Sequence, residues 1–180
     1  MGIKDNIEKF QTEVKPFGAR LIAVSKTHPV EKIREALAAG QSIFGENKVQ
    51  ELAGKQPQLP PEVEWHLIGH LQRNKVKFVV PFVALIHSVD SFKLLEEINK
   101  QGEKINRTIH CLLQVFIANE ETKFGLDLEE LHQIVQSKET ASLNLNFGPP
   151  LRPMNLLPFN SNVTTIGVSS IIFESLKTVQ

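Results

Sequence analysis

Residues 21–29 read Leu21-Ile22-Ala23-Val24-Ser25-Lys26-Thr27-His28-Pro29, and the rest of the chain can be interpreted from this stretch. Its first half is apolar or small and rich in β-branched side chains, as in a strand buried on both faces of a parallel sheet. Pro29 then opens a strongly helical pattern. A lysine at the end of such a strand lies where α/β folds bind ligands, and partial desolvation there makes its amine a nucleophile toward an aldehyde. The alternative is a surface lysine in a loop.

Strand and helix patterns alternate along the chain. After an amphipathic helix at residues 3–15, we expect strands at 20–25, 42–45, 64–69, 83–88 and 107–117, followed in turn by helices at 29–39, 46–53, 72–80, 91–101 and 126–136. A last strand is predicted at 163–168 and a last helix at 169–179. Repeated βα units imply parallel strands with covering helices. We therefore expect one α/β domain over residues 1–180, a (β/α)8 TIM-type barrel that is incomplete or irregular after residue 138.

The composition argues against several classes of protein. Twenty basic and twenty acidic residues cancel, so neither a nucleic-acid partner nor a charged membrane surface is expected. No apolar run approaches the roughly 20 residues of a membrane-spanning helix. The chain has one cysteine, Cys111, which favours a cytoplasmic location, and its apolar surroundings suggest a buried small hydrophobic residue. We expect a monomer.

Polar residues follow each of the five predicted strands. They are Lys26, Asn47, residues 70–75, residues 87–91 and residues 120–123. Because the carboxyl ends of parallel strands meet at one edge of a sheet, these clusters are expected on the face where a barrel carries its site.

Each cluster also has a simpler interpretation. Glu46 and Asn47 would serve equally as the start of a helix, and Asp90 and Ser91 as helix caps. The spacing of His66 and His70 does not indicate zinc, because that spacing binds a metal on a helix and His66 lies in a strand pattern. No metal site and no catalytic residue is predicted.

Five segments, in this order, resemble the pyridoxal phosphate homeostasis family of YggS/PROSC-type proteins. They are Ala-Val-Ser-Lys-Thr at 23–27, Phe-Gly-Glu-Asn at 44–47, Trp-His-Leu-Ile-Gly-His-Leu-Gln-Arg-Asn-Lys at 65–75, His-Ser-Val-Asp at 87–90 and Glu-Glu-Thr-Lys-Phe-Gly at 120–125. The resemblance implies a barrel like the N-terminal domain of alanine racemase. It implies that Lys26 holds pyridoxal 5′-phosphate as a Schiff base, and that Asn47 and His66 line the cofactor pocket. It further implies a protein without established catalytic turnover that takes part in vitamin B6 and amino-acid homeostasis.

The carboxyl-terminal part departs from this family's pattern. The family's Met-Gly-Met-Ser-type phosphate loop has no counterpart, and its late Arg-x-Gly-x-x-Ile-Phe-Gly turn is echoed at residues 167–174, with Gly167 and Ser169 in place of the arginine and glycine. Ser169 and Ser170 are predicted to supply hydroxyls and amides for the cofactor phosphate. Two alternatives stay open. One is an amino-acid racemase or lyase, although the chain has no tyrosine to act as a racemase base. The other is a barrel that has lost cofactor binding.

Overall fold

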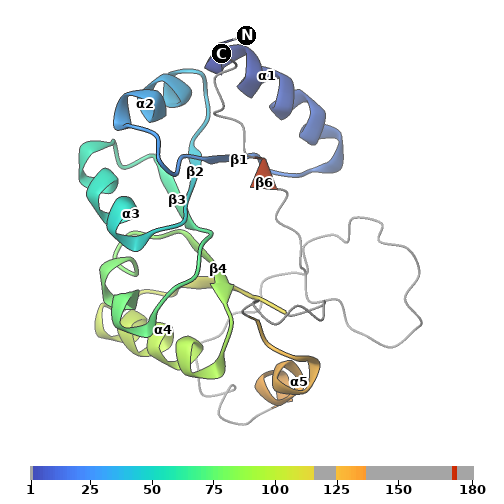
Figure 1. Ribbon diagram of the computed structural model, residues 1–180, viewed down its shortest axis with the longest axis vertical. Helices are drawn as coiled ribbons and strands as arrows, with labels where there is room; N and C mark the ends of the chain where they lie inside the picture. Colours follow the sequence, from blue (N-terminus) through green and yellow to red (C-terminus); the bar gives the residue numbers. More distant parts are fainter. Residues whose placement is uncertain (1, 116–124, 137–171, 174–180) are drawn as a thin grey trace.

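The computed structural model describes residues 2–115, 125–136 and 172–173, and Figure 1 shows how their helices and strands are arranged. The strands are β1 (Ile22–Val24), β2 (Ile43–Glu46), β3 (Glu64–Leu67), β4 (Leu85–Val89), β5 (His110–Leu113) and β6 (Ile172–Phe173). The α-helices are α1 (Ile3–Val14), α2 (Val30–Ala38), α3 (Val49–Lys55), α4 (Phe92–Lys104) and α5 (Leu128–Gln136). Short 3-10 helices cover Lys15–Phe17, Gln56–Gln58 and Arg73–Phe78.

The strands form one parallel sheet in the order β5-β4-β3-β2-β1-β6. Parallel neighbours need crossover connections, and α2, α3 and α4 follow one another along the same side of the sheet (Figure 1). The predicted parallel α/β architecture is therefore confirmed. The order also puts β6 beside β1, where a closing barrel would put its last strand.

The hydrophobic core lies between the sheet and these helices. Alternate strand residues face it, and Phe44, Trp65 and Ile86 are almost fully buried there. The rings of Phe44 and Trp65 lie 6.1 Å apart, centroid to centroid. Ile22 and Val24 are buried as well but lie outside this cluster, as expected for a strand with two apolar faces.

Near the first strands, two elements of the structure differ from those predicted from the sequence. Glu46 is the last residue of β2 and does not begin a helix, because its carboxylate is held by partners on α3 and the end of β1; α3 begins at Val49. The basic helix predicted at 72–80 is a 3-10 helix over Arg73–Phe78.

Further along the chain, two more elements of the structure differ from the sequence prediction. β5 begins at His110, not at residue 107, because the Arg107 N–H donates to the Gly102 carbonyl (3.0 Å) at the end of α4. The prediction of a helix over residues 169–179 is wrong at Ile172–Phe173, because these two residues form a strand that pairs with β1. The strand predicted at 163–168 lies outside the described residues.

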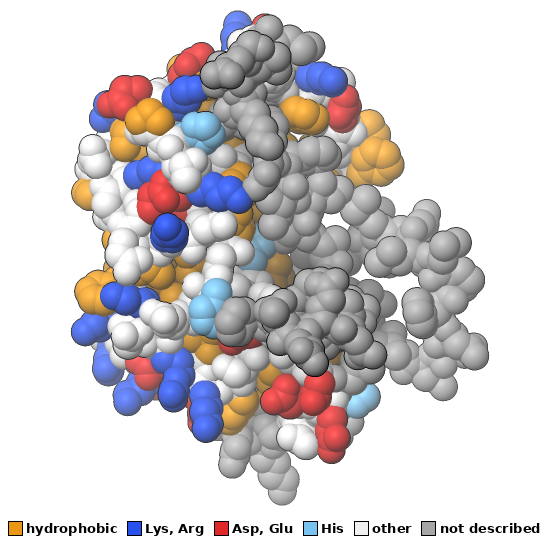
Figure 2. All heavy atoms as spheres, in the orientation of Figure 1, with side chains coloured by type: hydrophobic (Ala, Val, Ile, Leu, Met, Phe, Trp, Pro, Cys, Tyr) orange, Lys and Arg blue, Asp and Glu red, His pale blue; other side chains and the backbone are white. Residues whose placement is uncertain are grey.

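The balanced net charge conceals a local basic surface. Lysine and arginine side chains gather on the side of the molecule where α4 lies (Figure 2), and α4 carries exposed Lys93, Lys100 and Lys104. None of the helices that the structure describes is long and apolar enough to cross a membrane.

Candidate functional site

Lys26 lies in a four-residue turn directly after the carboxyl end of β1. The turn is closed by the His28 N–H, which donates to the Ser25 carbonyl (3.1 Å). Its third residue, Thr27, has φ 65°, a left-handed conformation that β-branched residues rarely adopt and that type II turns usually give to glycine. Lys26 is half-buried. The predicted position of this lysine, at the edge where parallel α/β folds bind ligands, is confirmed.

Asn47 follows the carboxyl end of the adjacent strand, β2, and is also half-buried. The loop after β3 packs tightly against it. A Cβ atom added to Gly69 would lie 2.3 Å from the carbonyl oxygen of Asn47 and 2.7 Å from its Cα, so only glycine fits there. The sheet therefore brings Lys26 and Asn47 to the same edge, with Gly69 allowing the third loop to approach.

His66 lies within β3 and is 5% exposed. Its Nδ1 is 3.0 Å from Nε2 of His87, and its Nε2 is 3.1 Å from Oε1 of Glu64, which also pairs with Arg20. Burial lowers the pKa of His66, although Glu64 opposes that shift. Burial and the neighbouring His66 lower the pKa of His87 to about 4.

Both imidazoles are therefore neutral at pH 7. The hydrogen-bond network assigns the His66 proton to Nε2, which donates to Glu64, while Nδ1 accepts from Nε2–H of His87. The role of His66 in a cofactor pocket stays a prediction.

A buried lysine on α3, Lys55, contacts the backbone beside Lys26. Its Nζ donates to the Ser25 carbonyl (2.8 Å), to Oε1 of Glu46 (2.7 Å) and to Oε1 of Glu51 (2.6 Å). These three bonds match the three donors of an ammonium group. Oε1 of Glu51 also accepts from the Thr27 N–H (2.7 Å). The residues before and after Lys26 are thus both tied to α3.

Glu46 completes this network and is fully buried. Its Oε1 also accepts from Oγ of Ser25 (2.7 Å), whereas its Oε2 has no hydrogen-bond partner in the part of the chain that the structure describes. Burial raises the pKa of Glu46, against the opposing hydrogen bonds from Lys55 and Ser25. In Glu51, burial alone would raise the pKa, but bonds from Lys55 and the Thr27 N–H bring it below its usual value. Sequence reasoning missed Glu51 and Lys55; their i,i+4 spacing was the available signal.

Asp90 has a different role from the predicted helix cap. Its Oδ2 lies 2.9 Å from Nδ1 of His70, so it joins the loops after β3 and β4. Ser91 is the N-cap residue of α4, but its hydroxyl donates to Asp90 (3.4 Å) and makes no capping bond to the helix.

Several predicted residues lie outside the described part of the chain. They are Ser169, Ser170 and residues 120–124. In residues 2–115, 125–136 and 172–173, no group of three or more His, Cys, Asp or Glu residues is arranged to hold a metal.

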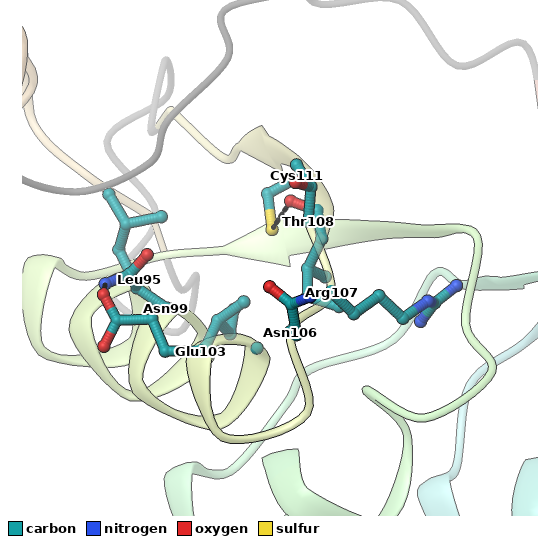
Figure 3. Close-up of a pocket in the computed structure, with 10 residues that line it drawn as sticks. Leu95, Asn99, Glu103, Asn106, Arg107, Thr108 and Cys111 are labelled. Atoms are coloured by element: carbon teal, nitrogen blue, oxygen red, sulfur yellow. Dashed lines mark hydrogen bonds between the residues drawn. The ribbon is translucent and has the colours of Figure 1, made fainter.

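A cavity of about 180 Å³ lies at the opposite end of the sheet from Lys26, where α4 leads into β5. Figure 3 shows Leu95, Asn99 and Glu103 of α4 on one side of it and Cys111 on the other, while the Arg107 side chain extends away. The guanidinium of Arg107 donates instead to the carbonyls of Val80 and Val83. Cys111, predicted to be buried, is partly buried and packs against the core, and desolvation raises the pKa of its thiol to about 12.

Comparison with known proteins gives one matching family and two relatives that share one name. The family described as alanine racemase, N-terminal domain, matches residues 2–147. A pyridoxal phosphate homeostasis protein of Aquifex aeolicus is 43% identical over 119 residues, which are 66% of this chain and 52% of that protein. The protein of that name from Homo sapiens is 38% identical over 137 residues, covering 71% of this chain and 50% of the relative. The chain thus spans about half the length of these relatives.

Two solved structures are similar to this chain in fold. The structure of PipY from Synechococcus elongatus with PLP bound is similar with a TM-score of 0.72 and 37% identity, covering 79% of this chain and 66% of that one. An alanine racemase from Bartonella henselae with covalently bound pyridoxal phosphate has a TM-score of 0.58 at 19% identity, covering 74% of this chain and 39% of that one. The second likeness concerns the fold alone.

Proposed function

Because this chain belongs to the alanine racemase N-terminal domain family, we propose that it binds pyridoxal 5′-phosphate covalently through Nζ of Lys26. The observation that carries the proposal is the position of Lys26, half-buried at the carboxyl edge of the sheet beside Asn47. The cofactor supplies an aldehyde carbon, which the amine attacks to form a Schiff base with loss of water. The homeostasis proteins and the PLP-bound PipY structure, which are similar to this chain, support the assignment.

The described residues fit the aldehyde end of such a ligand. Lys26 provides the amine, and Asn47 provides an amide that can donate and accept hydrogen bonds next to it. His66 is proposed as a further wall of the site, and Ser169 and Ser170 as partners of the phosphate.

We propose a non-catalytic role in which the protein holds the reactive aldehyde and releases it by transfer to another amine. This would place it in vitamin B6 and amino-acid homeostasis. The names of its relatives support that role, and the lack of any tyrosine argues against racemase chemistry of the alanine racemase type. A monomer with a single domain over residues 1–180 and a cytoplasmic location are part of the same proposal. The location is supported by the single cysteine, which leaves no disulfide within the chain.

The test is the absorbance of the imine after adding pyridoxal 5′-phosphate to the purified protein. Lys26→Ala should abolish the imine band, whereas Lys93→Ala, an exposed lysine on α4, should leave it unchanged. Imine bands of equal intensity in Lys26→Ala and the unmodified protein would contradict the assignment of Lys26 as the attachment site. Turnover of D- or L-amino acids by the loaded protein would replace the non-catalytic role with an enzymatic one.

A further inference from the structure

We propose that Glu51 and Lys55 are positioning residues, which hold the turn around Lys26 in a strained conformation and thereby aim its amine. The inference deepens the proposed function and rests on it. Glu51 and Lys55 bind the backbone on either side of Lys26, although they lie about 25 residues or more away from it in the sequence.

The turn is held from both ends. On the amino side, Nζ of Lys55 donates to the Ser25 carbonyl (2.8 Å). On the carboxyl side, the Thr27 N–H donates to Oε1 of Glu51 (2.7 Å). The Glu51 and Lys55 side chains bond each other (2.6 Å) and lie one turn apart on α3, so both contacts are fixed to one rigid element.

The conformation that these contacts hold is a costly one. Thr27 has φ 65°, a backbone conformation in which its β-branched side chain is crowded. A residue keeps such a conformation only where the contacts around it hold it in place. Glu51 supplies that constraint, since its lowered pKa keeps it an anion that accepts strongly from the Thr27 N–H. Without this acceptor, Thr27 should relax to negative φ. That change should rotate the peptide group between Lys26 and Thr27 and move the Lys26 side chain away from its position at the edge of the sheet.

Glycine at position 27 tests whether Glu51 acts through the backbone conformation of Thr27. Glycine adopts positive φ at no steric cost, so Thr27→Gly should keep the turn in place even without the Glu51 acceptor. If Glu51 only stabilised the fold, Glu51→Ala would slow labelling only as far as it unfolds the protein, and amide exchange would rise throughout the chain instead of mainly at residues 26–28.

The experiment measures how fast Lys26 reacts with pyridoxal 5′-phosphate. In the reaction, Nζ forms a bond to the aldehyde carbon, and the carbonyl oxygen leaves as water with the two amine hydrogens; borohydride then reduces the imine to a stable amine that peptide mass spectrometry locates. The proteins compared are the unmodified chain, Glu51→Ala, Thr27→Gly/Glu51→Ala, and the control Glu35→Ala, which removes an exposed carboxylate from α2. Amide exchange of the cofactor-free proteins gives an independent readout of the turn.

We expect Glu51→Ala to slow labelling of Lys26 by about tenfold, as the cost of a non-glycine left-handed residue suggests. Amide exchange at residues 26–28 should rise in the same variant. Glu35→Ala should match the unmodified chain, and Thr27→Gly should restore the rate in the double variant. If Glu51→Ala is unstable at the assay temperature, Glu51→Leu, which also removes the acceptor but keeps side-chain volume on α3, takes its place, with the same expected order of rates.

Two results would overturn the inference while leaving the proposed function intact. One is labelling of Lys26 at the unmodified rate in the Glu51 variant. The other is a slow Glu51 variant that Thr27→Gly does not rescue. If the unmodified chain does not react at Lys26, both the inference and the proposed function fail.

Discussion

Replacing Lys55 with methionine should destabilise the protein by about 3–5 kcal/mol at pH 7.5, because it removes the cation from a buried ion pair. Nζ of Lys55 lies 2.7 Å from Oε1 of Glu46, and the two side chains are 9% and 0% exposed. Solvent therefore screens this pair little, and a lone Glu46 carboxylate would be left in the interior. Its pKa, already raised by burial, would rise further.

The raised pKa gives this loss a definite pH dependence. A carboxyl whose folded pKa exceeds its unfolded value destabilises the folded state increasingly as the pH rises above the unfolded value, near 4.5. The cost of Lys55→Met should therefore be smaller at pH 5 than at pH 7.5. Adding Glu46→Gln should recover most of the loss, since no buried charge then remains.

Urea denaturation followed by tryptophan fluorescence is a suitable assay, because the chain has one tryptophan, Trp65, which is 2% exposed in the core. The four proteins of a double-mutant cycle give the coupling between Lys55 and Glu46. A loss below about 1 kcal/mol for Lys55→Met, or strictly additive single effects, would refute the reasoning that the pair is buried and coupled.

Two further predictions concern other parts of the structure. His87 has a folded pKa of about 4 against 6.5 for an unperturbed histidine, so the stability it confers is complete above pH 6.5 and falls as the pH drops toward 4. Between pH 7.5 and 5.5 the loss should be about 1.4 kcal/mol by linkage, and His87→Gln should show a correspondingly flatter pH profile of unfolding free energy; an unchanged profile would contradict the assignment. Gly69→Ala should cost about 1–3 kcal/mol in urea denaturation, because the new Cβ meets the Asn47 backbone. Gly54→Ala, in α3 with open space around it, is the control and should be neutral or stabilising, so equal losses would exclude the steric explanation.

The first strand and its lysine could be predicted because their signals are local. The apolar run before Lys26 and the proline after it define a strand, a turn and a helix without reference to the rest of the chain. Alternating patterns likewise predicted the parallel sheet. Element boundaries were less accurate, as at Glu46, because a carboxylate near a helix start looks the same whether it caps the helix or ends a strand.

The support of the site could not be predicted, because it depends on contacts between distant residues. Lys55 reaches a backbone carbonyl 30 residues earlier, at Ser25, and its sequence spacing indicates only a surface pair on a helix. Thr27 carries no sign of its left-handed backbone, since threonine is not a residue that favours it. Pairing of His66 with His87 needed the register of β3 and β4, which alternation within each strand does not reveal.

The most direct test is to locate the bound cofactor on the chain. Pyridoxal 5′-phosphate is added in equal amount to the purified protein, the mixture is reduced with borohydride, and the modified peptide is identified by mass spectrometry. We predict one cofactor per chain, attached to Nζ of Lys26. Modification spread over the exposed lysines, or its absence from the peptide containing Lys26, would contradict the assignment of this residue as the cofactor's attachment site.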